Sequence, residues 1–457
     1  MGANGSPIWE MSAQSMRGIR QSKVWRVIQV AAGNFLESYD VVIFAYFAPS
    51  IGRAYFPSDS EFATLMATFM TFGVAYLSRP LGAILIGPYV DRYGRRRGLI
   101  LTLCLMAIGT LAISTVPSFG SIGYLAPILV VCGRLVQGLS AGVEFGSVSV
   151  YLAEIATPGH RGFFVSWQSA SVQIAVVTSA LLGMTANSLL PPEAMESWGW
   201  RVPLWIGCGI IPLLFILRRS LQETEAFATR AHHLQFKEIW QSLANNWRLV
   251  LTGVFLVSLS NASFYMITTY TPTFGKSVLH LTQDSALLVT CCIGLSNFLL
   301  VPIGGALSDH FGRRPLLLLS AALMLLSAYP AMRFLVGAPS FNHLLGVELW
   351  LSLIYSGYNG ALIVFVTEIM PFEVRTAGFS LAYSISQAIF GGFTPLICTW
   401  LIHATGDNAV PGGWLSAVAL LSLGALFIHR RKPESFDQLP AVGFSTPNLI
   451  VRAEEQA

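Results

Sequence analysis

Long apolar stretches run through almost the whole chain and limit what it can fold into. A hydrocarbon core about 30 Å thick is crossed by roughly 20 apolar residues of α-helix. Only 11% of the residues are charged, whereas soluble domains carry about a quarter. These features predict an all-α membrane protein with twelve transmembrane helices. The approximate ranges of these helices are 24–50, 62–90, 98–116, 122–155, 162–187, 200–218, 247–275, 284–308, 315–336, 343–370, 376–404 and 411–430.

One polar gap divides these stretches into six before and six after it. The gap covers approximately residues 219–246 and is helix-prone. Residues 1–23 lack the short apolar core and small-residue cleavage site of a secretory signal, so we expect no processing. The predicted organisation has five parts: an N-terminal tail (1–23), a six-helix bundle (24–218), a linker (219–246), a second six-helix bundle (247–430) and a C-terminal tail (431–457).

The basic residues orient the bundle. Most lysines and arginines lie in the two tails, the linker and the loops that follow even-numbered spans, and few lie in the other loops. Because positively charged short loops stay cytoplasmic, both termini and the linker are expected to face the cytosol. The net charge of +4 therefore reflects membrane topology, and we expect no nucleic-acid partner.

A charged loop motif occurs twice. The stretch "GPYVDRYGRRRG" (Gly87–Gly98) aligns with "GGALSDHFGRRP" (Gly304–Pro315) at an offset of 218 residues. A second pair, "YLAEIATPGHRGF" (Tyr151–Phe163) and "VTEIMPFEVRTAGF" (Val366–Phe379), aligns at an offset of 214 and places a Glu seven residues before an Arg. Two repeats at nearly equal offsets predict two homologous halves, the architecture of an alternating-access carrier.

Both pairs of motifs are predicted to lie in cytosolic loops. There, acidic groups, arginines and helix ends can form a latch that opens and closes during transport. The candidate gating residues are Asp91, Arg92, Gly94, Arg95, Arg96, Glu154, Arg161, Asp309, Gly312, Arg313, Arg314, Glu368 and Arg375.

Five charged residues are expected near the middle of the first half, away from the ends of its spans. They are Glu37, Asp40, Arg79, Arg134 and Glu144. A charge at mid-bilayer costs roughly 2.5–3.5 kcal/mol, so such a residue is a functional candidate by default. Arg79 and Arg134 are candidates for substrate binding, because a guanidinium can hold a carboxylate by two parallel hydrogen bonds. The alternative is that each arginine pairs with Glu144 or Glu37 as a structural strut.

The three acids are candidate proton carriers. Glu37 and Asp40 stand three residues apart, so both can face one cavity. Burial and a neighbouring like charge both disfavour the ionised carboxylate. For Asp40 a structural role, accepting hydrogen bonds from nearby hydroxyl groups, is an open alternative.

Further polar residues in the spans can complete a binding pocket. Each alone is more often a helix-to-helix hydrogen bond than a ligand contact. The candidates are Gln168, Gln173, Asn261, Tyr265, Tyr358, Asn359, Ser384 and Gln387. Gly391 and Gly392, followed by Pro395, are a candidate functional feature of the eleventh span, because Gly and Pro permit a membrane helix to bend.

The composition also argues against other classes. The six cysteines lie in apolar runs and the eight histidines show no ligand spacing such as His-Glu-x-x-His, so no metal, cofactor or enzymatic activity is predicted. A channel would be expected to lack the paired loop motifs, and a non-transporting sensor would also carry a sizeable soluble output domain.

The loop after the second span resembles the signature Gly-x-x-x-Asp-Arg-x-Gly-Arg-Arg of the major facilitator superfamily. Within it, "GNFLESYD" (Gly33–Asp40), "SRPLGA" (Ser78–Ala83) and "GRLVQGLSAGVEFG" (Gly133–Gly146) are similar to the metabolite:proton symporters. The runs "RRSLQETEAF" (Arg218–Phe227) and "YTPTFGK" (Tyr270–Lys276) are similar to the citrate:proton symporters and their tricarballylate-transporting relatives.

This resemblance implies the major facilitator fold and a proton-coupled importer of a tricarboxylate, citrate or tricarballylate. It further implies a bacterial inner membrane location and a chain that works as a monomer. The alternative is a proton symporter of another organic acid, such as a dicarboxylate, an oxoacid or a shikimate-like compound. The C-terminal tail is too short for the coiled coil of the osmosensing proline/betaine members, which counts against an osmosensor.

Overall fold

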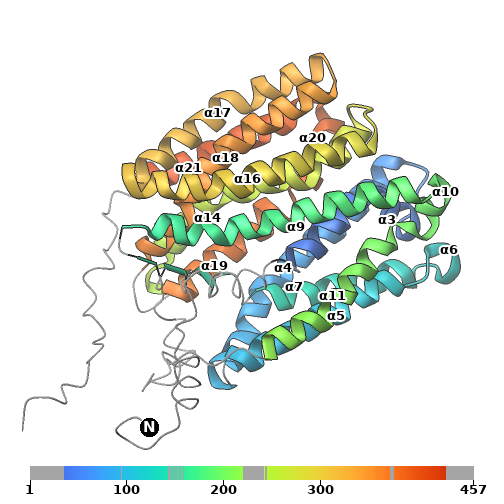
Figure 1. Ribbon diagram of the computed structural model, residues 1–457, viewed down its shortest axis with the longest axis horizontal. Coiled ribbons are helices and arrows are strands. Elements are labelled where there is room, and N and C mark those ends of the chain that lie inside the picture. The colour runs from blue at the N-terminus through green and yellow to red at the C-terminus, as the bar shows by residue number, and fades with distance from the viewer. Residues whose placement is uncertain are drawn as a thin grey trace, which may run out of the picture.

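The chain forms two neighbouring groups of long helices that run in roughly the same direction (Figure 1). The fold is seen in a computed structural model of all 457 residues. The structure describes residues 35, 37–93, 95–142, 145, 148–149, 152–153, 156–157, 159–219, 241, 244–370 and 375–428.

The first group of helices precedes residue 220. Residues 37–46 are helical. The helices that follow are α3 (Ala48–Tyr55), α4 (Glu61–Tyr93), α5 (Arg95–Thr115), α6 (Phe119–Ile122), α7 (Leu125–Ala141), α9 (Arg161–Leu189), α10 (Pro192–Ala194), the π-helix η1 (Met195–Gly199) and α11 (Arg201–Arg219).

The second group follows the linker. Its helices are α14 (Trp247–Phe264), the π-helix η2 (Tyr265–Tyr270), α15 (Thr271–Ser277), α16 (Gln283–Phe311), α17 (Arg313–Gly337), α18 (Phe341–Ile369), α19 (Arg375–Ser386), the π-helix η4 (Gln387–Gly391), α20 (Thr394–Thr405) and α21 (Val410–Ile428).

The residues at two helix ends explain why the helices begin or end there. Ser340 caps α18 by accepting the amide N–H of His343, and Gly312 joins α16 to α17 at a φ of 90°, which favours glycine.

The helices have the length and composition of membrane spans. Within the described part of the chain, eight helices are long and apolar enough to cross a bilayer. Two shorter apolar helices cover Ile100–Thr115 and Leu125–Ala141. Large apolar side chains face outwards, including Leu85 and Leu326, which are 67% and 72% exposed. In lipid, every backbone N–H and C=O group must be hydrogen-bonded within the protein, as it is in an α-helix. Long helices with outward-facing apolar side chains therefore indicate a multi-pass membrane protein.

Two of the long spans are interrupted near their middle. α14 passes through η2 into α15, whose first turn contains Pro272. α19 passes through η4 into α20, where Gly391 and Gly392 precede Pro395. The eleventh span is therefore interrupted at the glycine pair that was expected to permit bending. π-Helical turns inside α-helices are frequent at functional sites.

Two seams join the groups of helices. α9 runs beside α16 (Figure 1). α4 packs against α19, η4 and α20. Small residues allow close approach at both seams. A Cβ atom on Gly73 of α4 would overlap the ring of Phe393, and one on Gly392 would overlap Tyr76. The seams place side chains of both groups around a shared interior.

Candidate functional site

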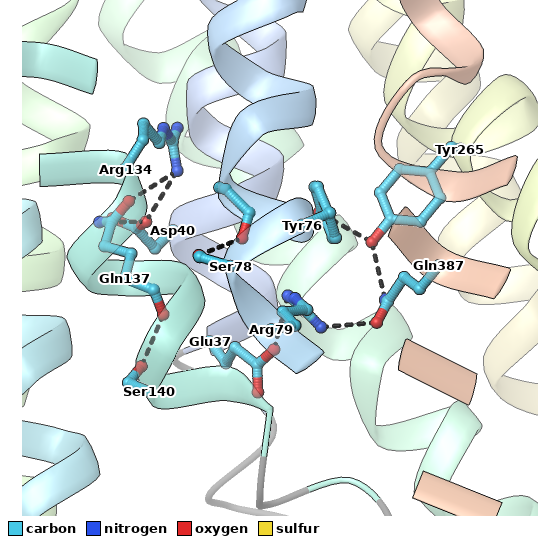
Figure 2. A network of polar contacts seen from close by, with 11 residues as sticks. Glu37, Asp40, Tyr76, Ser78, Arg79, Arg134, Gln137, Ser140, Tyr265 and Gln387 are labelled. Carbon is cyan, nitrogen blue, oxygen red and sulfur yellow. Dashed lines mark hydrogen bonds and ion pairs between the residues drawn. The ribbon is translucent and has the colours of Figure 1, made fainter. Parts of the chain in front are cut away.

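A polar network centred on Arg79 crosses from one group of helices to the other (Figure 2). Arg79, on α4, is only 5% exposed. Its Nη2 lies 2.8 Å from Oε1 of Glu37, and its Nη1 donates to Oε1 of Gln387 at 2.6 Å. Gln387 in turn donates to the hydroxyl of Tyr265 at 3.0 Å, which donates to that of Tyr76 at 2.8 Å. A single cation is thus held between an acid of the first half and an amide of the second.

Arg79 lies in the wall of a cavity between the two groups of helices. The cavity has about 610 Å³ free of protein atoms, including the part open to solvent. Its polar wall residues are Glu37, Ser38, Arg79 and Ser169 from the first group and Ser260, Asn261, Tyr265, Tyr355, Asn359, Tyr383 and Gln387 from the second. Its apolar wall residues are Val41, Val42, Phe145, Val172 and Phe264. One cation among many hydrogen-bonding groups suits an organic anion.

The wall is held in shape by contacts between its own residues. Ser169 of α9 donates to Oδ1 of Asn359 at 3.1 Å, and Asn359 donates to the hydroxyl of Tyr355 at 2.5 Å. Phe145 stacks on Tyr383, with ring centroids 3.8 Å apart. The Ser169 and Phe145 contacts join the two groups of helices across the cavity.

A second network surrounds Asp40. Its Oδ2 accepts from Gln137 at 2.6 Å and lies 3.3 Å from Nη1 of Arg134. Its Oδ1 accepts from Thr110 at 3.0 Å. The Arg134 guanidinium lies 3.6 Å from the centre of the Phe44 ring. Figure 2 shows this network beside that of Arg79.

Arg134 lines a smaller pocket that adjoins the cavity. This pocket has about 340 Å³ free of protein atoms, and Glu37 and Arg79 line both spaces. Arg134 is paired with Asp40, whereas Glu37 and Glu144 were the partners considered from the sequence, and Glu144 lies outside the described residues. A role for Arg134 in substrate binding stays a prediction, as does the alternative of a structural strut.

Besides Arg134, four predicted binding residues are not among those that line the cavity. Gln168 accepts from Ser149 at 2.5 Å and donates to the carbonyl of Phe145. Tyr358 donates to the carbonyl of Leu256. Gln173 is fully buried, and within the described part of the chain its side-chain amide has no hydrogen-bond partner. Ser384 is buried too. A role for these four residues in substrate binding therefore stays a prediction.

Several predicted gating residues meet at one end of the seam between α9 and α16. Asp309 accepts the backbone N–H groups of Gly162 and Phe163 at 2.8 and 2.9 Å, so a carboxylate of α16 caps the N-terminus of α9. Arg313 lies 2.8 Å from Asp309 and 3.5 Å from Glu368. This cluster ties α16, α17 and α18 to the other group of helices.

The remaining gating candidates are placed as follows. Arg314 donates to the carbonyl of Leu426, and Arg375 donates to that of Met370. Arg161 is the first residue of α9. The side chains of Asp91, Arg92, Arg95 and Arg96, and all of Gly94, Glu144 and Glu154, lie outside the part of the chain that the structure describes.

Sequence reasoning missed some residues of the site. Gln137 stands three residues after Arg134 and shares its helix face, a signal that could have found it. Tyr76 precedes Arg79 by the same spacing. Tyr355 and Tyr383 gave no such signal, because tyrosines are common in apolar spans.

The chain is similar to known transporters over nearly its whole length. The family described as sugar (and other) transporter matches residues 25–235 and 219–435. The citrate-proton symporter of Klebsiella pneumoniae is 51% identical over 411 residues, which are 90% of this chain and 93% of that protein. The citrate-proton symporter of Salmonella typhi is 52% identical over 399 residues, covering 87% of this chain and 92% of the relative.

A solved structure supports the fold. The proton:xylose symporter of the major facilitator superfamily, bound to 6-bromo-6-deoxy-D-glucose, aligns with a TM-score of 0.71 at 18% identity, covering 89% of this chain and 96% of that one. The expected major facilitator fold is therefore confirmed. With an interior cavity between two groups of membrane helices and matches over nearly its full length, this chain belongs to the sugar (and other) transporter family.

Proposed function

We propose that this chain imports a tricarboxylate, citrate or tricarballylate, in symport with protons by alternating access. The observation that carries the proposal is the buried cavity shared by both groups of helices, in which Arg79 is paired with an ionisable acid, Glu37. The 51% and 52% identity to citrate-proton symporters supports a tricarboxylate as the substrate.

The guanidinium of Arg79 is proposed to bind either Glu37 or a carboxylate of the substrate. Its Nη2 is paired with Oε1 of Glu37. When Glu37 takes up a proton, the ion pair is lost and a substrate carboxylate can replace it on the guanidinium. Asn261, Asn359 and Gln387 then supply amide groups for the remaining carboxylate oxygens. This exchange couples occupancy to protonation.

The charge of the substrate makes proton coupling necessary. Moving one elementary charge against the membrane potential costs about 2.3 kcal/mol per 100 mV. A tricarboxylate anion therefore needs protons that at least neutralise its charge before import is favourable. Besides Glu37, the acids proposed to carry protons are Asp40 and Glu144.

The cluster around Asp309 is proposed as the cytosolic latch. Its carboxylate holds the N-terminus of α9, so breaking these contacts separates α9 from α16. The related loop from Asp91 to Arg96 is proposed to act in the same way. We also propose that both termini and the linker face the cytosol and that the chain lies in a bacterial inner membrane. The transporting unit is proposed to be the monomer, with residues 24–218 and 247–430 as its two moving bundles.

The substrate is tested by competition in proteoliposomes that contain the purified chain. Uptake of labelled citrate is measured with an excess of unlabelled citrate, tricarballylate, oxoglutarate or betaine, and protein-free liposomes give the background. We expect citrate and tricarballylate to abolish the labelled uptake and the other two compounds to leave it nearly unchanged. Stronger competition by oxoglutarate than by tricarballylate would instead identify a carrier of smaller organic acids.

A further inference from the structure

A buried acid lies in the second group of helices, away from the Arg79 network. Glu348, on α18, is only 1% exposed. It stands seven residues after the first residue of α18, about 10 Å along the helix. An ionised carboxylate at such a position is costly unless it is paired.

The contacts of Glu348 fit a protonated carboxyl group. Its Oε1 lies 2.9 Å from Oγ1 of Thr271. A threonine hydroxyl has one hydrogen to donate, and the nearest acceptor for it is the carbonyl oxygen of Ile267 at 2.5 Å. The hydroxyl oxygen of Thr271 is then free to accept a hydrogen bond from the acid. The other oxygen, Oε2, is buried and has no hydrogen-bond partner among the described residues.

No cation compensates this acid in the part of the chain that the structure describes. The titratable and charged groups on α18 itself and on the elements packed against this end of it have other partners. Lys276 bonds to Gln283, and Asp284 bonds to Asn187. Tyr329 and Arg333 both bond to Asp407, and His343 bonds to the carbonyl of Ala338. Tyr270 bonds to Thr399, and Tyr355 bonds to Asn359. Glu348 is therefore set in a neutral environment.

Two helical segments link Glu348 with residues that line the cavity. Tyr355 follows it by seven residues on α18, which is two turns along the same helix face, and Tyr355 lines the cavity. Thr271 follows the cavity residue Tyr265 by six residues, through the π-helix η2. A movement of η2 that opens the cavity also moves the hydroxyl that contacts Glu348.

We propose that Glu348 is a proton-binding site of this transporter, separate from the Arg79 and Glu37 pair. Its carboxyl group gains a proton from water on the outer side and holds it while α15 covers it. It loses the proton to water when η2 and α15 move away from α18. The proposal deepens the proposed symport and rests on it.

The test compares protons and citrate moved by the same vesicles. Proteoliposomes with a pH-sensitive dye inside take up labelled citrate, and the ratio of protons to citrate is measured for the unaltered chain, for Glu348→Gln and for Glu193→Gln. Glu193 is exposed in the segment between α9 and α11, so its variant is the matched control. We expect Glu348→Gln to move one proton fewer per citrate, with citrate exchange kept, and the control to match the unaltered chain.

Each outcome decides a separate question. An unaltered chain that moves no protons with citrate would refute the symport itself. Proton movement in the unaltered chain with the same ratio in Glu348→Gln would overturn the role of Glu348 alone. If Glu348→Gln does not insert into membranes, Thr271→Val decides. Without the hydroxyl, the protonated acid loses the acceptor of its hydrogen bond and holds its proton less tightly, so the external pH of half-maximal uptake should fall, and an unchanged midpoint would overturn the proposal.

Discussion

Arg79 makes two contacts at once that depend on the shape of its guanidinium. Nη2 faces Glu37 and Nη1 faces Gln387, at 2.8 and 2.6 Å. The same group lies 4.4 Å from the centre of the Tyr76 ring. A planar fork can satisfy an acid, an amide and an aromatic face together, whereas an ammonium group is a compact point charge.

Arg79→Lys should therefore weaken citrate transport while keeping the charge. Losing one charge-assisted hydrogen bond costs about 1.5–3 kcal/mol, which predicts a KM about 10- to 100-fold higher in proteoliposome uptake. The control is Arg333→Lys, because Arg333 is 68% exposed beside Asp407 and should show an unaltered KM. An equal KM for Arg79→Lys and the unaltered chain would mean that the guanidinium does not contact substrate.

The sequence allowed the charged residues of the site to be predicted, but not their partners. Glu37, Asp40, Arg79 and Arg134 were found because ionisable residues are rare inside apolar spans. The division into an Arg79–Glu37 pair and an Arg134–Asp40 pair depends on the rotation of three helices about their axes, which no spacing within one helix determines. Glu348 is likewise an ionisable residue inside an apolar span, but it was not among the residues predicted from the sequence.

At the scale of elements, the spans were predictable because length and hydropathy determine them. The predicted span 284–308 corresponds to α16 at Gln283–Phe311, and 343–370 corresponds to α18 at Phe341–Ile369. The interruption of the eleventh span lies at Gly391 and Gly392, where the sequence indicated that the helix can bend. The π-helices η2 and η4 were not predicted, because a single inserted residue leaves no clear trace in hydropathy.

The seam between α4 and the eleventh span should tolerate no larger residue than glycine at two positions. A Cβ on Gly73 or Gly392 would overlap the ring of Phe393 or Tyr76. We expect Gly73→Ala and Gly392→Ala to keep binding of labelled citrate in detergent but to lose most uptake, because the seam cannot close. Gly424→Ala is the control, since a Cβ there meets no atom within 4 Å. Uptake by both seam variants equal to that of the control would show that the seam need not close this tightly.

At the scale of the whole molecule, the two groups of helices hold one cavity between two kinds of contact. At one end Asp309 ties α16 to the N-terminus of α9. At the opposite end Asn187 of α9 donates to Asp284 of α16 at 2.9 Å, and Phe62 stacks on His403, with ring centroids 3.9 Å apart. Contacts at both ends of a shared cavity are the arrangement that alternating access requires, because each end can then open while the other stays closed. The repeated loop motifs allowed the two halves to be inferred from sequence, whereas the contacts that close each end could not be inferred.

The most direct measurement of this account is citrate uptake driven by a proton gradient alone. Proteoliposomes are given an acidic exterior and a neutral interior, with the membrane potential clamped at zero, and labelled citrate inside the vesicles is followed with time. The account predicts accumulation above the external concentration, which collapses on addition of an uncoupler. Equilibration of citrate to the external concentration without accumulation, whatever the pH difference, would contradict proton symport.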